Sequence, residues 1–283
     1  MFMLKYKPVN IAIAQLTSVD DFNFNIDQIV KLIVIANSES ENTKPEIIFF
    51  PENSIYFRIN QNEQLPKLSL QSDAVFKLEK ISQTTGISLH LTSGFFDEGK
   101  MWNASILIKP GESAQIVYKK IHLFDIELSG EKSIKESDVF SAGNEISNFS
   151  VDYLNIGSSI CYDLRFAELY SCHAAVAVDA IVIPSAFLVK TGRAHWEVLL
   201  RARAIESQCY VIAPAQSGIH ESIQSTGLKR ETYGNSMLID PWGEIIDQKK
   251  QGIGLIFGQI DRHKCLDVRQ QIPMKNHRKQ FKI

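Results

Sequence analysis

Cys161 is the residue whose surroundings most clearly suggest chemistry. A short apolar run at residues 154–160 ends at this cysteine, and a polar, helix-compatible stretch begins directly after it. This pattern predicts a strand that delivers a thiol to a turn beside the free backbone N–H groups of a following helix. Such a position suits a nucleophile. The next question is which residues activate that thiol.

A cysteine hydrolase needs a base for the thiol proton, positive charge near the oxyanion and a proton source for the leaving group. Histidine is the first candidate base, and the chain has 7 histidines. Two of them, His122 and His195, lie in strongly patterned segments. On the residues alone, a Cys–His pair stays open.

Glu52 is a second candidate base. It follows the apolar run 47–50 and Pro51, so it lies at the end of a predicted strand, the same topological position as Cys161. A carboxylate against apolar walls has a raised pKa, which suits a general base near neutral pH. The alternative is an exposed loop glutamate, because most glutamates are solvated.

Two adjacent lysines, Lys119 and Lys120, occupy one predicted strand and must point to opposite faces. A lysine that faces the interior needs a carboxylate partner, or its pKa falls. Alternation alone does not say which lysine faces inward. Two lysines that protect an edge strand are the alternative interpretation.

The composition narrows the class of protein. The chain has 283 residues, 45% of them hydrophobic, and a net charge of −2, which argues against a nucleic-acid partner. No apolar run approaches the ~20 residues of a membrane span, and no signal-peptide pattern follows Met1. The 4 cysteines form no Cys-x-x-Cys pair. We therefore expect a cytoplasmic protein with reduced thiols, no metal, no cofactor and no membrane partner.

Strand-like runs alternate with helical patterns along the whole chain, without a linker or a repeat. Helices are expected at residues 25–36, 72–84, 166–176 and 194–207. Strands are expected at residues 9–15, 46–50, 87–93, 101–108, 115–120, 154–160, 180–183, 209–214, 236–239 and 254–259. So many strands exceed one compact open sheet, so we expect a single α/β domain over 1–283 with two sheets packed face to face and helices outside.

Taken in order, these segments resemble the nitrilase superfamily of carbon–nitrogen hydrolases. The resemblance runs from Ile11 to about Pro273 and rests on a glutamate, a lysine and a cysteine in that order, followed by several shorter motifs. The matching segments are Phe50-Pro51-Glu52-Asn53, Lys120-Ile121-His122-Leu123, Cys161-Tyr162-Asp163-Leu164-Arg165, Pro184-Ser185-Ala186-Phe187, Tyr233-Gly234-Asn235-Ser236 and Asp240-Pro241-Trp242-Gly243.

The resemblance implies a four-layer αββα sandwich and a Glu–Lys–Cys triad. Glu52 would be the general base and later the acid, Lys120 would stabilise the tetrahedral intermediate, and Cys161 would be the nucleophile. Glu136 looks like the second glutamate of the family and would hold Lys120, whose charge would favour the thiolate. The two patterned histidines would then be structural.

The resemblance also implies a substrate class. Cys161-Tyr162-Asp163 is similar to the amidase-like branch that contains deaminated glutathione amidase and ω-amidase, whereas true nitrilases usually carry Cys-Trp-Glu. We therefore expect a small linear ω-amide, first deaminated glutathione, cleaved to 2-oxoglutarate and Cys-Gly. The alternatives are 2-oxoglutaramate, a generic aliphatic amide or N-carbamoyl substrate, and a catalytically idle scaffold, against which the intact triad argues.

The resemblance implies that the Tyr162 N–H completes the oxyanion hole, and substrate contacts are also expected from Arg165, Ser185 and Phe187. An anionic substrate needs a cation beyond Lys120, for which Arg165 is the main candidate and Arg193 a weaker one; a structural salt bridge is the alternative for Arg165.

The chain departs from the family pattern at Asn235, where histidine is common, at Ala167, which replaces a frequent proline, and at residues 217–232, a longer polar loop that could line the pocket. The resemblance also implies a homodimer, built by the helices after Cys161 and by the tail at about 264–283. The apolar residues of 194–207 extend beyond one narrow stripe, which fits burial in an interface; they are Trp196, Leu199, Leu200 and Ile205.

Overall fold

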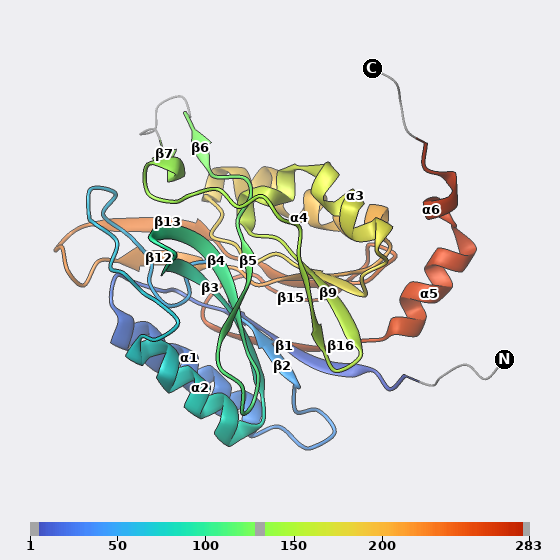
Figure 1. The fold of residues 1–283 in the computed structure, drawn as a ribbon, viewed down its shortest axis with the longest axis horizontal. Helices are drawn as coiled ribbons and strands as arrows, with labels where there is room; N and C mark the ends of the chain where they lie inside the picture. Colours follow the sequence, from blue (N-terminus) through green and yellow to red (C-terminus); the bar gives the residue numbers. More distant parts are fainter. Residues whose placement is uncertain (1–5, 128–133, 280–283) are drawn as a thin grey trace.

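The computed structural model describes residues 6–127 and 134–279 (Figure 1). Its first six-stranded sheet has the order β16-β1-β2-β3-β4-β5. Its strands are β1 (Val9–Gln15), β2 (Ile47–Phe49), β3 (Ser88–Asp97), β4 (Lys100–Ile108), β5 (Gln115–Lys119) and β16 (Gly254–Ile260). The second six-stranded sheet has the order β15-β14-β11-β10-β9-β8. Its strands are β8 (Asn148–Val151), β9 (Leu154–Ser158), β10 (Ala180–Val182), β11 (Tyr210–Ala213), β14 (Ser236–Ile239) and β15 (Ile245–Lys249).

Alternation along the central strands creates separate apolar layers. In β1, Ile11 and Ile13 pack between the two sheets, whereas Ala12 and Ala14 pack under the helices of the first sheet. Those helices are α1 (Phe22–Asn37) and α2 (Asp73–Thr85). The predicted stripe of α1 is buried there, and Asp21 caps the helix by accepting from the Phe24 N–H.

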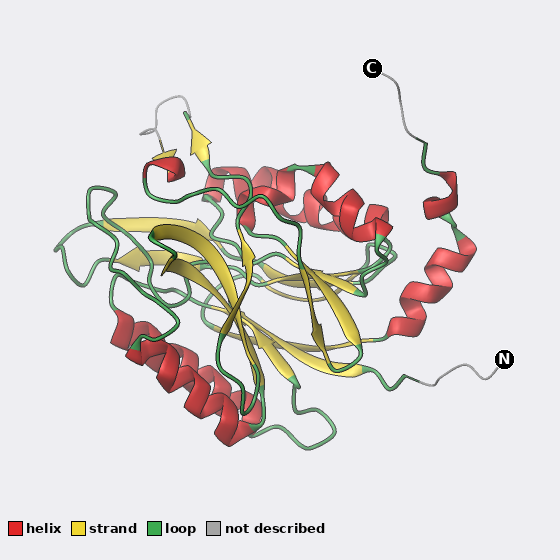
Figure 2. Cartoon of the chain, in the orientation of Figure 1, coloured by secondary structure: helices red, strands yellow, loops and turns green. Residues whose placement is uncertain are grey.

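The helices α3 (Ala167–Ala175) and α4 (Val189–Ser207) cover the outer face of the second sheet (Figure 2). The layers therefore follow the order helix pair, sheet, sheet, helix pair, with one apolar layer between each two neighbours. The expected αββα arrangement is confirmed.

Several elements differ from the sequence prediction. The α4 helix starts at Val189 rather than at residue 194, and its Gly192 is needed because a Cβ there would meet the Tyr233 ring at 2.3 Å. The polar loop expected at 217–232 is largely a hairpin of β12 (Ser217–Glu221) and β13 (Lys229–Tyr233). Its buried His220 makes hydrogen bonds with the Ser18 carbonyl and the Thr232 hydroxyl. Because such inward residues are polar, the segment lacks the apolar alternation from which a strand is predicted.

Shorter elements complete the described chain. They are β6 (Asp125–Ile126), β7 (Ile134–Lys135), the 3₁₀ helices η1 (Glu136–Asp138) and η2 (Cys161–Arg165), α5 (Arg262–Gln271) and α6 (Met274–His277). None of the described helices is long and apolar enough to cross a membrane.

The apolar residues of 194–207 divide between the core and the surface. Trp196 and Leu200 are buried in the chain's own core under the second sheet, which accounts for their apolar character, whereas Ile205 is exposed. The expected tail packs on the same helices: Arg278 donates to the carbonyls of Ser171 and Glu206. Residues 280–283 of that tail, and the start of the chain at 1–5, lie outside the described residues.

Candidate active site

Cys161 lies where a strand of the second sheet turns into a helix. The β9 strand ends at Ser158, and Cys161 begins η2 with a positive φ of 48°. Its N–H donates to the Pro184 carbonyl at 2.9 Å, which holds this sparsely populated conformation. The side chain is only 8% exposed. The predicted placement of a thiol at a strand end is confirmed.

Glu52 comes from the first sheet, just beyond β2. It is 4% exposed, and its Oε2 accepts from the Ala186 N–H at 2.9 Å. The apolar walls expected around it are absent, because its other carboxylate oxygen accepts from Lys120 and from Asn103. The base candidate and the thiol therefore meet across the two sheets.

The two adjacent lysines separate as alternation requires. Lys119 remains partly exposed and pairs with Asp97 at 2.9 Å, whereas Lys120 is 2% exposed. The Lys120 Nζ lies 3.0 Å from Glu52 Oε1 and 2.8 Å from Glu136 Oε2. Its backbone is held on both sides, because its N–H donates to the Asn103 carbonyl and its carbonyl accepts from the Gly143 N–H.

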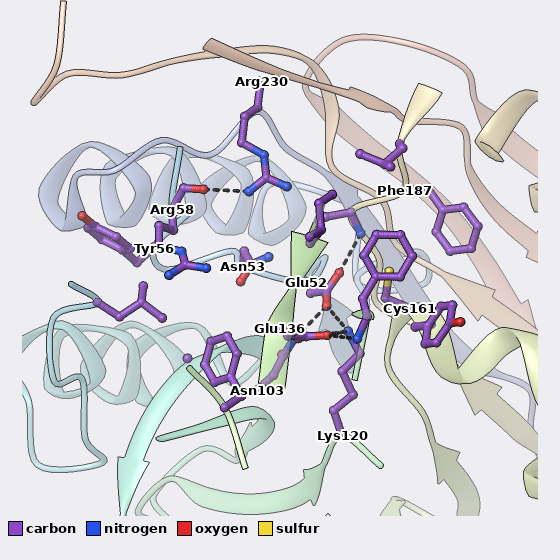
Figure 3. Close-up of a pocket in the computed structure, with 18 of the residues that line it drawn as sticks. Glu52, Asn53, Tyr56, Arg58, Asn103, Lys120, Glu136, Cys161, Phe187 and Arg230 are labelled. Carbon is purple, nitrogen blue, oxygen red and sulfur yellow. Dashed lines mark hydrogen bonds and ion pairs between the residues drawn. The ribbon is translucent and has the colours of Figure 1, made fainter. Parts of the chain in front are cut away.

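Asn103 of β4 connects the two carboxylates. Its Nδ2 donates to Glu52 Oε1 at 2.8 Å and to Glu136 Oε1 at 2.7 Å (Figure 3). Glu136 also accepts from the Phe124 N–H at 2.6 Å. Each carboxylate thus has Lys120, Asn103 and one backbone N–H as donors, which fixes the ammonium between two anions.

The charges of this network set the protonation states. Burial alone would lower the pKa of Lys120, but Glu136 and then Glu52 raise it well above its ordinary value, so the ammonium is charged. Burial and the Glu52 charge raise the pKa of the Cys161 thiol, and the opposing effects of Lys120 and the Ala186 N–H are smaller. The expected effect of Lys120, whose charge favours the thiolate, is present, but burial and Glu52 outweigh it, so the pKa of the thiol lies well above its ordinary value.

Histidine is not the partner of the thiol. No histidine is among the described residues that line the cavity around Cys161. His122 Nδ1 lies 2.7 Å from Asp163 Oδ1, and its ring stacks on Phe166 at 3.6 Å. His195 contacts the Arg165 guanidinium at 3.1 Å. His122 therefore has a structural role, as the resemblance implied, whereas His195 is exposed and contacts the Arg165 side chain.

Asp163 is a structural residue of the thiol turn. Its buried carboxylate accepts from the Ile160 N–H at 2.9 Å, from the Tyr118 hydroxyl at 2.8 Å and from the His122 N–H at 2.9 Å. Burial and the Asp163 charge raise the pKa of Tyr118, which keeps that hydroxyl a donor. The carboxylate therefore ties the turn that carries Cys161 to the strand that precedes Lys120.

Three of the four expected substrate contacts line the cavity, namely Tyr162, Arg165 and Phe187. Within the described chain, no acceptor is found for the Tyr162 N–H, as expected in the first turn of a helix. The Arg165 guanidinium lies 5.7 Å and 5.5 Å from the ring centroids of Tyr162 and Phe187, and no described carboxylate forms the alternative salt bridge. Ser185 is not at the cavity: it is fully buried, and its hydroxyl donates to the Ile183 carbonyl.

Sequence reasoning missed several residues of this cavity, whose volume is about 960 Å³ with its open mouth included. The most polar of them are Asn103, Tyr56, Arg58 and Arg230. The signal for Arg230 lay in the polar segment 217–232, which was expected to line the pocket. Arg193, the weaker cation candidate, is exposed and lines a different depression.

Among residues 6–127 and 134–279, no three His, Cys, Asp or Glu side chains gather closely enough to hold a metal ion. The 4 cysteines are all free thiols.

Comparisons with known proteins identify the family. The family model described as carbon-nitrogen hydrolase matches residues 10–270. The chain is 35% identical over 280 residues to the deaminated glutathione amidase of Synechocystis sp., which covers 96% of this chain and 98% of the relative. It is also 35% identical over 276 residues to the nitrilase and fragile histidine triad fusion protein NitFhit of Caenorhabditis elegans, covering 95% of this chain but only 60% of that protein.

Solved structures give the same result. The crystal structure of Caenorhabditis elegans NitFhit superposes with a TM-score of 0.84 at 33% identity, over 96% of this chain and 65% of that one. Saccharomyces cerevisiae Nit3, described as a member of branch 10 of the nitrilase superfamily, gives a TM-score of 0.77 at 26% identity, over 95% of each chain.

Proposed function

Because the chain belongs to the carbon-nitrogen hydrolase family, we propose that it is a thiol-dependent amidase that cleaves the C–N bond of a small linear ω-amide. The observation that carries this proposal is the Lys120 ammonium fixed between Glu52 and Glu136 beside a buried, protonated Cys161. That arrangement has a nucleophile, a proton acceptor and a fixed positive charge in one cavity.

The proposed reaction passes through a thioester. Glu52 takes the proton of the Cys161 thiol as Sγ bonds to the amide carbon, and the oxyanion is stabilised by the Lys120 ammonium and the Tyr162 N–H. The C–N bond then breaks, and Glu52 gives its proton to the departing amine. Water attacks the thioester with Glu52 as base, the S–C bond breaks, and Glu52 returns the proton to Sγ.

We propose deaminated glutathione as the substrate, with 2-oxoglutarate and Cys-Gly as products. The similarity to the Synechocystis deaminated glutathione amidase along nearly the whole of both chains supports this choice. The Arg165 guanidinium, free of a described carboxylate, is available for an anionic substrate. The second candidate is 2-oxoglutaramate, the alternative substrate that the resemblance implied.

A direct assay separates these substrates. Purified protein is incubated with deaminated glutathione, 2-oxoglutaramate and simple aliphatic amides and nitriles, and Cys-Gly and ammonia are measured. Release of ammonia from 2-oxoglutaramate without cleavage of deaminated glutathione would overturn the first choice. Full turnover by Cys161→Ala would overturn the mechanism.

The scaffold alternative has its own test, which needs no substrate. Iodoacetamide is added to the native protein, and labelled cysteines are identified by mass spectrometry. An active site requires faster labelling at Cys161 than at the fully buried Cys209. Equal labelling of both thiols would favour an inert scaffold.

We also propose a cytoplasmic homodimer. The 4 free thiols support a reducing compartment, and the exposed apolar side chains of α4 and its surroundings, Val198, Ile205 and Trp242, support a second copy against this face. Sedimentation analysis of the parent protein and of Val198→Glu tests this assembly: a monomeric parent would contradict it.

A further inference from the structure

Two arginines occupy the part of the cavity away from the thiol. Figure 3 shows Arg58 and Arg230 on one side of Glu52 and Cys161 on the other. Arg230 belongs to β13, and one of its terminal nitrogens donates to the Arg58 carbonyl at 2.8 Å. Its guanidinium lies 5.0 Å from the centroid of the Phe57 ring. The backbone of one arginine therefore positions the side chain of the other.

Neither guanidinium has a counter-ion in the part of the chain that the structure describes, where no carboxylate lies within 4.0 Å of them. The acids whose charges act on the pair are Glu63, Glu136 and Asp138 for Arg58 and Glu52 for Arg230. Most of them are engaged elsewhere: Glu63 accepts from the Tyr56 hydroxyl, and Glu52 and Glu136 accept from Lys120 and Asn103. No described group accepts a hydrogen bond from the Arg58 side chain.

The electrostatics of the pair point the same way. Burial lowers the pKa of Arg58, and burial followed by the Arg58 charge lowers the pKa of Arg230. Two like charges, partly removed from water and without a partner, are unfavourable in the free protein. An anion between them would relieve that cost and satisfy the free N–H groups.

Part of the cavity wall is apolar. Phe22, Leu65, Leu68 and Phe140 line the same cavity. A guanidinium binds a carboxylate through two parallel N–H···O bonds, which makes arginine well suited to this anion. A ligand with a short carbon chain and a terminal carboxylate matches both the apolar wall and the arginines.

We propose that Arg58 and Arg230 form a carboxylate-binding subsite, which holds a carboxylate of the substrate while its amide carbon lies at Cys161. This inference rests on the proposed amidase function, because it assigns the far end of the same substrate. It makes the enzyme selective for amides of dicarboxylic acids over neutral amides of equal length.

Two matched substrates test the subsite. Glutaramate, the monoamide of glutaric acid, and pentanamide have the same chain length and differ in the terminal carboxylate. Since hydrogen bonds to charged groups are strong, Arg58→Gln should lower kcat/KM for glutaramate about 10- to 100-fold, and at least tenfold more than for pentanamide. Arg58→Lys, which keeps the charge but loses the planar fork, should lie between.

Arg193→Gln is the matched control, because this exposed arginine lies outside the cavity and should change neither substrate. An equal loss for both substrates in Arg58→Gln would overturn the proposal in favour of a structural role, and so would no loss at all. Arg230→Gln should repeat the selectivity change; if it does not fold, Arg58→Gln decides alone.

A binding measurement keeps this inference separate from the amidase proposal. Glutarate should raise the melting temperature of Cys161→Ala, and adding Arg58→Gln should abolish most of that shift. If no amide is hydrolysed but glutarate still binds through Arg58, the amidase proposal fails and the subsite stands. If amides are hydrolysed but glutarate binds equally with and without Arg58, the subsite is wrong.

Discussion

Replacing Asn103 by leucine should disable the enzyme without removing any residue of the triad. Asn103 Nδ2 makes hydrogen bonds of 2.8 Å and 2.7 Å to two buried carboxylates, and such bonds to ionised groups are worth about 1.5–3 kcal/mol each. Both carboxylates retain Lys120 and one backbone N–H as donors. We therefore expect a net loss of about 3 kcal/mol, the lower end of the sum for two such bonds.

If that loss falls on the alignment of Glu52, kcat should drop about 100-fold, since each 1.36 kcal/mol is tenfold in rate. KM should change little, because the carboxylates act on the reacting bond rather than on the rest of the substrate. The assay is steady-state turnover, with circular dichroism and a melting curve to establish folding. Asn144→Leu, an exposed asparagine, is the control. A folded Asn103→Leu protein with kcat within threefold of the parent would refute the reasoning.

Three further predictions concern the thiol, a buried histidine and a glycine. Because the Glu52 charge raises the pKa of Cys161, Glu52→Gln should lose turnover and yet move the pH midpoint of Cys161 alkylation downward; an upward shift would contradict the electrostatics. Burial lowers the pKa of His90 to about 3. As the pH falls below about 6.5, the imidazole therefore binds a proton in the unfolded chain but not in the folded one. This difference lowers the free energy of unfolding by about 1.4 kcal/mol per pH unit. His90→Phe should reduce this slope in urea unfolding between pH 6 and pH 4 by one proton; an unchanged slope would be inconsistent with a neutral buried imidazole. Gly143→Ala should lower the free energy of unfolding by about 1–3 kcal/mol, because its Cβ would lie 2.2 Å from the Lys119 carbonyl oxygen. An unchanged free energy of unfolding would contradict this and would show that the backbone at Lys119 moves away without cost.

The proposed triad was predicted through the order of the family motifs, whereas the position of each member at an element boundary left alternatives open. Cys161 and Glu52 end apolar strands, and Lys120 follows a strand directly, so their backbones fix where they lie. The structure adds the protonation state of the thiol, which depends on burial and on the balance of Glu52 against Lys120. Such a balance needs distances, which a sequence does not contain.

The remaining site residues lack such a signal. Asn103 lies inside β4, and its partners Glu52 and Glu136 are 51 and 33 residues away along the chain. Arg58 lies in a loop without regular structure, and Arg230 lies in a hairpin whose inward residues are polar. Their roles come from long-range packing rather than from periodicity.

The predicted bounds of the strands and helices likewise agree where a local pattern sets them and differ where tertiary contacts do. The bounds of β1 agree with the prediction because its apolar run ends sharply, and α1 differs by a few residues at its start. The predicted start of α4 was five residues too late, since Val189 lies beyond a glycine that tertiary contact with Tyr233 requires. Tertiary contacts therefore account for the difference.

The proposed base and the proposed nucleophile belong to different sheets, so catalysis would depend on the docking of the two sheets. Glu52 and Lys120 are carried by the first sheet and Cys161 by the second, so neither half of the sandwich holds a competent site. A shift of one sheet over the other by 1 Å would cost about 10²-fold in rate even if every side chain stayed in place. During folding, the thiol therefore meets the proposed base only when the two halves have docked, so turnover should appear no earlier than that docking.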